Sequence, residues 1–291
     1  MRIFIAVAER EHVTRAAQVL NITQSAASAA IAALEAQHGV RLFDRVGRGI
    51  VLTDAGRLLL DEARAVLARA ADAERALAEH GGLKRGTLRL VASQTIAGYW
   101  LPERLARFHT RYPGIELCVG IANSEGAARR VAAGEADLGF IEGNLEAPEL
   151  VHRVVGTDRL QLVAAAPVAT VDNDWLARTP WIMREPGSGT RARFEEALAA
   201  RGIDPRTLPI ALTLPSNEAV LSAVRAGAGA AVLSRLVVAP ALAMRALFAL
   251  PLDLPERPFY ALRHPERHRS KAAEALLMLI EDYDRHGDWV I

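Results

Sequence analysis

The stretch TRAAQVLNITQSAASAAIAALEAQHGVRLFDRVGRGIVLT, residues 14–53, decides how the first part of the chain folds. Small and aliphatic residues recur at helical spacing on both sides of a break at residues 21–23. Asn21 can adopt the left-handed conformation of a tight turn, and Thr23 is suited to cap the helix that follows. The spacing therefore predicts two short helices that pack on each other, a helix-turn-helix.

A basic hairpin is predicted directly after the second helix. Two short apolar runs, residues 40–43 and 50–52, flank a glycine-rich tip. Arg45 and Arg48 extend from this wing and have the length and charge to contact DNA phosphates or a narrow minor groove. Helical hairpins with small residues are also common in ordinary protein cores. The attached wing is the feature that favours DNA binding over that alternative.

The helix-turn-helix and wing together resemble the LysR-type transcriptional regulators. The resemblance rests on Arg15-Ala16-Ala17, Leu20, Gln24, Ala27-Ser28, Ile31, Leu34-Glu35, Gly39, Leu42-Phe43, Arg45, Arg48, Leu52-Thr53 and Ala55-Gly56. Two positions depart from the family pattern: His12 replaces a small Ser or Gly, and Ala29 replaces a base-contacting Arg or Lys. Readout is therefore expected to lean on DNA shape and on short polar groups. The expected DNA-binding residues are Thr23, Gln24, Ser25, Ser28, Arg45, Arg48 and Thr53.

Composition limits the class of protein. The chain has 291 residues, 51% of them hydrophobic, which suits two or three compact units. The net charge is only +1, so the case for DNA rests on where the arginines cluster. The single Cys118 excludes an internal disulfide and, within an apolar run, is expected in the core. The N-terminal apolar run is too short for a signal peptide and no run is long enough to span a membrane, so a cytoplasmic protein is expected.

A long helix is predicted from residue 54 to about 79, with Thr53 as its cap. Its apolar residues alternate spacings of four and three, which is typical of a coiled-coil seam: Leu59, Ala63, Val66, Ala70, Ala73 and Leu77. The interpretation preferred here is a homodimer, and the alternative is a helix that packs on its own domain. Family resemblance further implies a homotetramer, with RNA polymerase as a further partner. Gly81-Gly82 should end the helix at a hinge.

Strands and helices alternate after the hinge, which predicts parallel βαβ units in two α/β lobes. Expected strands are 87–92, 115–121, 136–141, 181–184, 210–214, 230–233 and 259–263, and expected helices are 102–112, 125–133, 190–201, 218–226 and 270–285. This order resembles the effector domain of the LysR family, itself similar to periplasmic solute-binding proteins. The expected domains are 1–58, a winged helix-turn-helix; 59–85, a linker helix and hinge; and 86–291, a regulatory domain with lobe 1 at 86–162 and 264–291 and lobe 2 at 163–263.

A ligand site is expected between the two lobes, because ligands of such sheets collect at the carboxyl ends of parallel strands. Two loops, residues 93–95 and 186–191, follow strands and open helices, so their amides and hydroxyls are predicted to face each other around a small anionic effector. Simple helix capping is the alternative for each residue. The expected effector-binding residues are Ser93, Gln94, Thr95, Asn123, Glu142, Arg184, Gly187, Ser188, Gly189, Thr190 and Asn217.

An enzyme finds no support in the sequence, which lacks the HExxH, CxxC and GxSxG patterns. We therefore predict no catalytic residue, no cofactor and no metal site. The predicted function is a DNA-binding transcriptional regulator whose contacts with double-stranded operator DNA respond to a small-molecule effector. Two alternatives remain: a DNA-binding or nucleoid protein without an effector response, and a solute-binding module, which would need a secretory signal.

Overall fold

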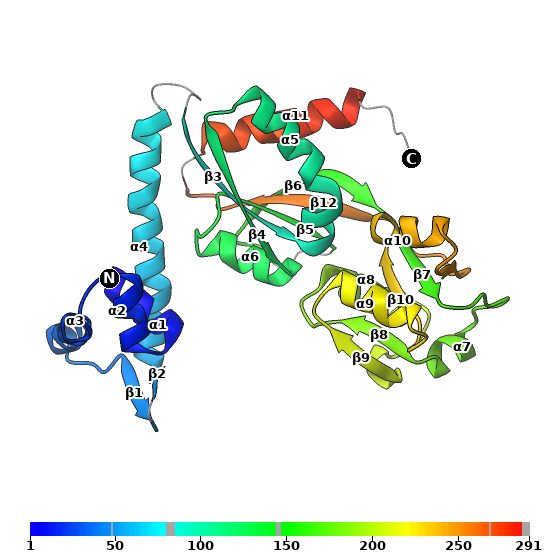
Figure 1. Cartoon of the computed structure of the whole chain (residues 1–291), viewed down its shortest axis with the longest axis horizontal. Helices are drawn as coiled ribbons and strands as arrows, with labels where there is room; N and C mark the ends of the chain where they lie inside the picture. Colours follow the sequence, from blue (N-terminus) through cyan, green and yellow to red (C-terminus); the bar gives the residue numbers. More distant parts are fainter. Residues whose placement is uncertain (48, 80–84, 144–146, 268, 287–291) are drawn as a thin grey trace. The chain divides into compact units, whose positions relative to one another are not determined.

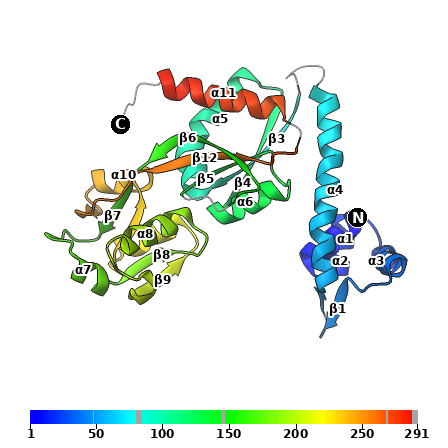
Figure 2. The same cartoon turned by 180° about the vertical axis from the view of Figure 1, so that it is seen from behind.

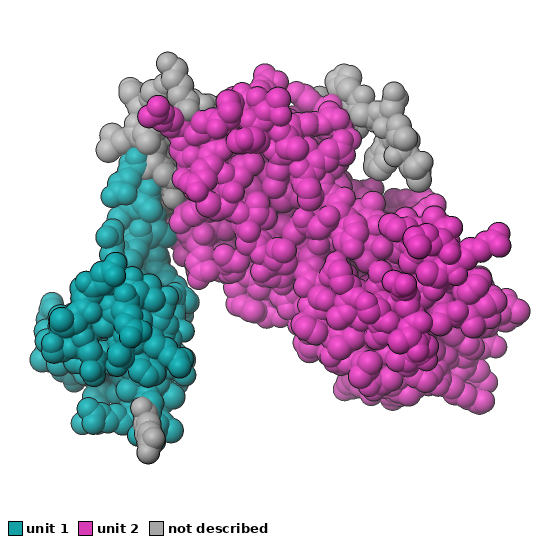
Figure 3. All heavy atoms as spheres, viewed as in Figure 1, with its two compact units in different colours: residues 1–77 teal, residues 78–291 magenta. Residues whose placement is uncertain are grey.

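The computed structural model describes residues 1–47, 49–79, 85–143, 147–267 and 269–286. It divides into two compact units, Met1–Leu77 and Ala78–Ile291, coloured separately in Figure 3. Arg48 and residues 80–84, which include the expected hinge, lie outside the described residues. Among the described residues, no helix has the length and apolar character needed to cross a membrane.

The first unit begins with three helices and a hairpin, and a fourth helix follows them. The first three helices are α1 (Arg2–Arg10), α2 (Val13–Val19) and α3 (Gln24–His38). As the sequence predicts, Asn21 adopts a left-handed φ of 53°, and the Thr23 hydroxyl accepts the Ala26 N–H at 3.1 Å. Gly39, with a φ of 65°, ends α3 in the left-handed conformation that glycine adopts without strain. The helix-turn-helix is thus confirmed in its local geometry.

The wing consists of β1 (Phe43–Val46) and β2 (Gly49–Leu52), an antiparallel pair in which Phe43 lies opposite Leu52. The helix α4 (Asp54–Glu79) follows at once. Phe4, Val7, Ile31 and Leu42 form the centre of this unit's core, and Ala63 of α4 is completely buried against them. The start of α4, at least as far as Ala63, therefore packs on the core of the winged unit.

The second unit begins with a five-stranded sheet of order β4-β3-β5-β12-β6. Its strands are β3 (Gly86–Ser93), β4 (Ile115–Ala122), β5 (Leu138–Glu142), β6 (Val151–Asp158) and β12 (Arg257–Arg263). β3 pairs in parallel with β4 and β5, whereas β12 is antiparallel to β5 and β6. The parallel part is the predicted βαβ arrangement.

Helices cover both faces of this sheet (Figures 1 and 2). The π-helical turn η1 (Ile96–Trp100), α5 (Leu101–Arg111) and α11 (Lys271–His286) pack on the face that carries Leu88 and Leu90. The helix α6 (Ser124–Ala132) covers the opposite face, where Val91 points. Adjacent β3 residues thus enter different cores, because successive side chains of a strand point to opposite faces.

The second lobe holds two smaller sheets, one of order β10-β7-β11 and one of β8 and β9. Its strands are β7 (Leu160–Ala164), β8 (Trp181–Arg184), β9 (Ile210–Leu214), β10 (Ala231–Ser234) and β11 (Phe248–Ala249). Its helices are α7 (Asn173–Arg178), α8 (Gly189–Ala199), η2 (Pro205–Thr207), α9 (Asn217–Arg225) and α10 (Arg235–Ala243). Of these, the sequence did not predict β7, α7, η2, α10 or β11.

Two expectations need correction. The strand β12 pairs within the first sheet, and β7 pairs within the second lobe. The chain therefore passes from lobe 1 to lobe 2 near Arg159, instead of at residue 162, and returns to lobe 1 near Glu256, instead of at residue 263. Cys118, expected in the core, is exposed. It lies on β4, the edge strand of its sheet, where the expectation of burial on both faces fails.

Candidate functional site

The outward face of α3 carries short polar side chains. Gln24, Ser25 and Ser28 are exposed, while Ala27 and Ile31 on the inner face are buried. Neither Gln24 nor Ser28 has a side-chain hydrogen bond with any described residue, whereas the Ser25 hydroxyl lies 3.0 Å from that of Thr23. The face therefore keeps amide and hydroxyl groups available for an external partner.

The wing adds a cation to the same unit. Arg45 is exposed at the end of β1 and forms no ion pair with any described residue. A hollow of about 250 Å³ lies between the start of α2, Gln24 of α3 and the wing, and Arg45 is part of its lining. The first turn of α3 and the wing thus border one recessed surface.

Two of the residues expected at the DNA have a structural task within the fold. Thr23 caps α3, as described above, and Thr53 caps α4 by accepting the Gly56 N–H at 2.9 Å. The Thr53 hydroxyl also donates to the Arg41 carbonyl oxygen at 2.7 Å, and this bond joins the start of α4 to the segment just before β1. The capping alternative thus applies to both threonines.

The expected seam of α4 divides into two parts. Ala63 is completely buried and Leu59 half-buried in the core of the winged unit, so this part packs on its own domain. Val66 is 49% exposed and Leu58 69% exposed. Val66, one heptad after Leu59, is therefore a member of the predicted seam that stays exposed among the described residues, whereas the exposed Leu58 lies outside that seam.

One set of polar contacts connects the two lobes through Asn217, and is called the Asn217 bridge. The Asn217 Nδ2 donates to the Thr95 hydroxyl at 3.2 Å, and its Oδ1 accepts from the Arg184 guanidinium at 2.5 Å. The Gln94 amide accepts the Asn217 N–H at 2.9 Å and donates to the Pro215 carbonyl oxygen at 2.9 Å. Asn217 and Thr95 are completely buried, so the hydrogen bond between their side chains joins lobe 1 to lobe 2 out of contact with water.

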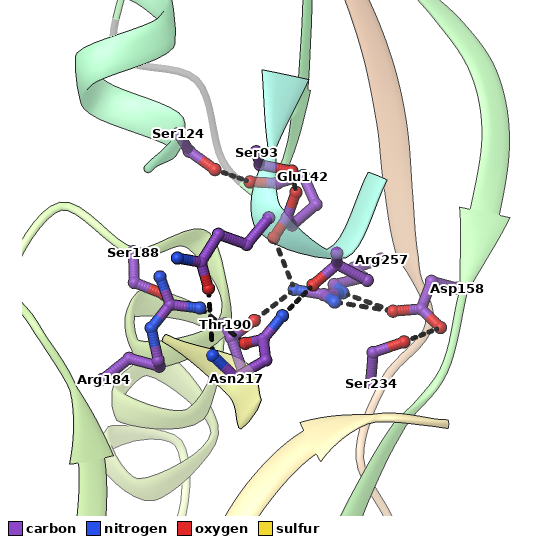
Figure 4. Close-up of polar contacts among 12 residues, drawn as sticks. Ser93, Ser124, Glu142, Asp158, Arg184, Ser188, Thr190, Asn217, Ser234 and Arg257 are labelled. Carbon is purple, nitrogen blue, oxygen red and sulfur yellow. Dashed lines mark hydrogen bonds and ion pairs between the residues drawn. The ribbon is translucent and has the colours of Figure 1, made fainter. Parts of the chain in front are cut away.

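A second set surrounds Arg257 at the start of β12 (Figure 4). The guanidinium of Arg257 donates twice to Asp158, at 2.6 and 2.8 Å, and once to the Thr190 hydroxyl at 2.9 Å. It also lies 3.6 Å from the Glu142 carboxylate, which accepts from the Ser93 hydroxyl. Ser234 donates to Asp158 at 2.9 Å. These six residues form the Arg257 cluster, and all of them are buried.

The two loops that were expected to face each other bind different partners. The Ser93 hydroxyl contacts Glu142, and residues 94 and 95 contact Pro215 and Asn217. The loop before α8 meets lobe 1 elsewhere: the Asn123 Nδ2 donates to the Pro186 carbonyl at 3.2 Å, and the Glu125 N–H to the Gly187 carbonyl at 3.2 Å. The loops therefore join one lobe junction without touching directly.

Several expected effector residues instead cap helices or allow a close approach between backbone segments. Ser188 caps α8 through the Arg191 N–H at 3.5 Å, and Asn123 caps α6 through the Gly126 N–H at 2.8 Å. A Cβ added to Gly189 would overlap the Glu142 carbonyl oxygen, so α8 reaches lobe 1 only because this residue is glycine. Gly187 has a left-handed φ of 83°.

The charges at the junction are two arginines against three carboxylates. Arg257 lies between Asp158 and Glu142, and Arg184 binds the Glu185 carboxylate through Nε and an Nη, at 2.8 and 2.9 Å. The Arg184 side chain is 4% exposed, whereas that of Glu185 is 26% exposed. The junction is therefore not an open cationic site, and each guanidinium already has an acid partner.

The sequence did not identify Arg257, Asp158 or Ser234 as parts of this junction. Arg257 begins an otherwise apolar strand, and Asp158 stands between two apolar runs, so each is a charge at a strand end. Such a charge usually marks a solvated turn. Only the antiparallel register, in which Arg257 lies opposite Asp158, shows that the two form a pair.

The fold and these surfaces define a class: a winged DNA-binding unit joined to a two-lobed α/β domain with a polar junction. Two family models match the chain. One, described as a bacterial regulatory helix-turn-helix protein of the lysR family, matches residues 1–57, and the other, the LysR substrate binding domain, matches residues 81–285. The chain belongs to the LysR family of transcriptional regulators. Its sequence-based recognition, its fold class and its function as a DNA-binding, effector-responsive regulator are thereby confirmed.

Relatives with known names agree over nearly the full length. The uncharacterized HTH-type transcriptional regulator YeiE of Escherichia coli K12 is 35% identical over 95% of this chain and 94% of its own length. The regulator CbbR of Rhodospirillum rubrum is 33% identical over 97% of this chain and 94% of its own. These homologues are regulators, not enzymes.

Solved structures show the same fold. Full-length CbnR complexed with its target DNA superposes with a TM-score of 0.66 at 22% identity, and covers 97% of each chain. The regulatory domain of CcmR from Synechocystis PCC6803, in complex with 2-PG, has a TM-score of 0.61 at 25% identity and covers 70% of this chain and 99% of that domain.

Proposed function

We propose that this regulator reads operator DNA with the first turn of α3 and holds the DNA backbone with its wing. The observation that carries this assignment is the exposure of Gln24, Ser28 and Arg45, none of which has a polar partner among the described residues. Polar groups that the fold leaves unbonded on a surface of this shape are suited to base edges in the major groove and to phosphates. Ser25 belongs to the same face, and Arg48 to the same wing.

Base contacts and phosphate contacts can be distinguished by how the affinity for DNA depends on salt concentration. Gln24→Ala should flatten the discrimination between operator and mutated sites by about 1–3 kcal/mol, because an amide reads a base edge. Arg45→Ala and Arg48→Ala should weaken operator and random DNA alike, and each should lower the salt dependence by about one phosphate contact. Arg178→Ala, which changes an exposed arginine of the second lobe, is the matched control. Unchanged affinity in all three test variants would contradict the assignment.

The effector proposed for the lobe junction is a small anion. The hydroxyl oxygens of Thr95 and Thr190 already accept hydrogen bonds, from Asn217 and Arg257, and neither hydroxyl donates to a described residue. Each O–H is therefore available as a donor to an acceptor ligand. Thr95 is connected to the Arg184 guanidinium through Asn217, whereas Thr190 is bonded to Arg257.

An anion must compete with an internal carboxylate. The Nε and Nη of Arg184 form the two-pronged edge that binds oxyanions, and Glu185 holds that edge in this structure. Glu185 is the more exposed partner, so it is the group that can swing away. We therefore infer that the effector replaces Glu185 on Arg184, and that this exchange changes the balance between lobe arrangements on which DNA binding depends.

Calorimetric titration with sulfate, sulfite, phosphate and small carboxylates tests this exchange. Glu185→Gln should bind the active anion more tightly, because the competing charge is removed, whereas Arg184→Gln should abolish binding. Thr95→Val and Thr190→Val should each weaken it by about 0.5–1.5 kcal/mol, the value of one hydrogen bond. Glu195→Gln, which affects the α8 pair with Arg191, is the control. Equal affinity in all of the junction variants would place the effector elsewhere.

We propose a homodimer joined through α4, and a homotetramer when the lobe domains also pair. The apolar exposed side chains of Leu58 and Val66 support this assignment. Val66→Glu would place like charges across the seam. Sedimentation of the full-length variant should then show half the native mass, and Arg69→Glu should not have this effect. Such a regulator would act in the cytoplasm beside promoters, where RNA polymerase is its further partner.

A further inference from the structure

The hollow beside the wing has a feature that no assignment above uses. His12, the residue before α2, lines it together with Gln24 and Arg45. The His12 Nδ1 accepts the Arg15 backbone N–H at 3.4 Å and thereby caps α2. While Nδ1 accepts this hydrogen bond, Nε2 is the ring nitrogen that can donate an N–H to another group. That N–H has no acceptor among the described residues.

The position of the hollow shows what can fill it. A recognition helix enters the major groove, and a wing reaches the neighbouring minor groove. One sugar-phosphate strand separates these two grooves, so it must pass between the helix and the wing. The hollow lies between Gln24 at the first turn of α3 and Arg45 of the wing, and its volume is about 250 Å³. It is thus open where that strand crosses.

The described residues that line the hollow carry one charge of each sign. Among its described lining residues, Glu11 is the one carboxylate and Arg45 the one arginine. Glu11 therefore offsets part of the attraction of Arg45 for a phosphate, and hydrogen-bond donors add to the binding of an anion in the hollow. His12 lines the hollow, and its Nε2 can supply such a donor while Nδ1 caps α2.

We propose that the hollow seats a DNA phosphate and that His12 binds this phosphate as a neutral donor through Nε2. The proposal rests on the DNA-reading surface assigned above and adds a contact to it. A serine or glycine at this position would cap α2 or leave it uncapped, but would not reach into the hollow. His12 thus supplies affinity without sequence preference, which complements the loss of a cation at Ala29.

Two variants separate the donor from the cap. His12→Ser keeps a good capping hydroxyl, but its side chain is too short to contact the phosphate. His12→Gln keeps an N–H donor at the end of a long side chain, but glutamine is a poor cap. Binding of the full-length protein to a random-sequence duplex and to DNA upstream of its own gene is measured at several salt concentrations, with melting temperatures to verify folding. His38→Ser, at the far end of α3, is the matched control.

His12→Ser should bind both duplexes about threefold to tenfold more weakly, as expected for one hydrogen bond. The salt dependence should stay at the native value, because a neutral donor releases no counterion, whereas Arg45→Ala lowers it by about one. His12→Gln should recover most of the lost affinity. Glu11→Gln should bind both duplexes more tightly, because a carboxylate beside the phosphate is removed.

The inference is overturned if His12→Ser binds like the native protein while His12→Gln does not, because the imidazole then only caps α2. It is also overturned if His12→Ser lowers the salt dependence as much as Arg45→Ala, since that requires a charged ring. If Gln24→Ala and Arg45→Ala also leave binding unchanged, the DNA-reading surface itself is misplaced. If those two weaken binding and His12→Ser does not, only the contact proposed for His12 fails.

Discussion

The winged unit and the lobe junction treat polar side chains in opposite ways. On the winged unit, Gln24, Ser28 and Arg45 are exposed and have no polar partner among the described residues. At the junction, Thr95, Asn217 and Arg257 are completely buried and bonded to one another or to their neighbours. A surface for a long rigid partner can keep its donors ready in water. A site enclosed by the protein must satisfy its own groups until a ligand replaces some of those bonds.

The largest expected effect is the loss of the buried arginine. Arg257→Met would leave Asp158 and Glu142 buried without their cation, so the free energy of unfolding should fall by about 3–5 kcal/mol. Urea unfolding of the full-length protein measures this. The control is Arg159→Met, because Arg159 pairs with Glu256 on the surface at 2.6 Å, and it should cost about 1 kcal/mol or less. Equal losses would mean that burial at the junction makes no difference.

A smaller effect is expected from closing the gap that Gly189 leaves. Gly189→Ala would drive a methyl group into the Glu142 carbonyl, so α8 and β5 must separate. The cost should be about 1–3 kcal/mol in urea unfolding. Gly98→Ala is the control, because a Cβ at Gly98 meets nothing within 4 Å. If Gly189→Ala leaves the free energy of unfolding unchanged, the lobes can separate at this point without cost. The junction would then be less closely packed than its contrast with the exposed winged unit requires.

The smallest effect concerns a contact between lobes that is still partly in water. Burial, and then the Glu218 carboxylate, raises the pKa of the Tyr99 phenol above its ordinary value. The resulting stabilisation is present below the pKa of an unfolded tyrosine and is lost as the pH rises through the higher folded value. Glu218→Gln should lower the pKa of Tyr99, as followed by ultraviolet absorbance with Tyr99→Phe as the blank. No change would mean that the lobes are apart at alkaline pH.

Local rules predicted the winged unit well. Asn21, Thr23 and Gly39 each have a conformational preference that acts within a few residues, and the structure places each of them in the predicted turn or cap. The sequence likewise predicted three strands of the first lobe's sheet, β3, β4 and β5, because the apolar run of a strand is visible in a window of a few residues. It did not predict β6 as a strand, and it assigned β12 to the second lobe.

The lobe junction was predicted only in part, because its contacts join distant residues. Ser93, Thr190 and Asn217 were recognised by their place after strands, yet their partners lie between 33 and 123 residues away. Arg257 and Asp158 meet through an antiparallel register that no local pattern encodes. Cys118 was misplaced for the same reason, since whether a strand lies at the edge of a sheet depends on the order of all strands.

The strand order β4-β3-β5-β12-β6 also has a consequence for synthesis on the ribosome. β12 lies between β5 and β6, but it follows the whole second lobe in the chain. While that lobe is being translated, β5 has an unpaired edge and β6 has no neighbour. The nascent chain therefore carries an open strand edge, a template for wrong pairing, until residue 263 emerges. The first lobe to begin is thus the last to close, and Arg257, the first residue of β12, reaches Asp158 only at that moment.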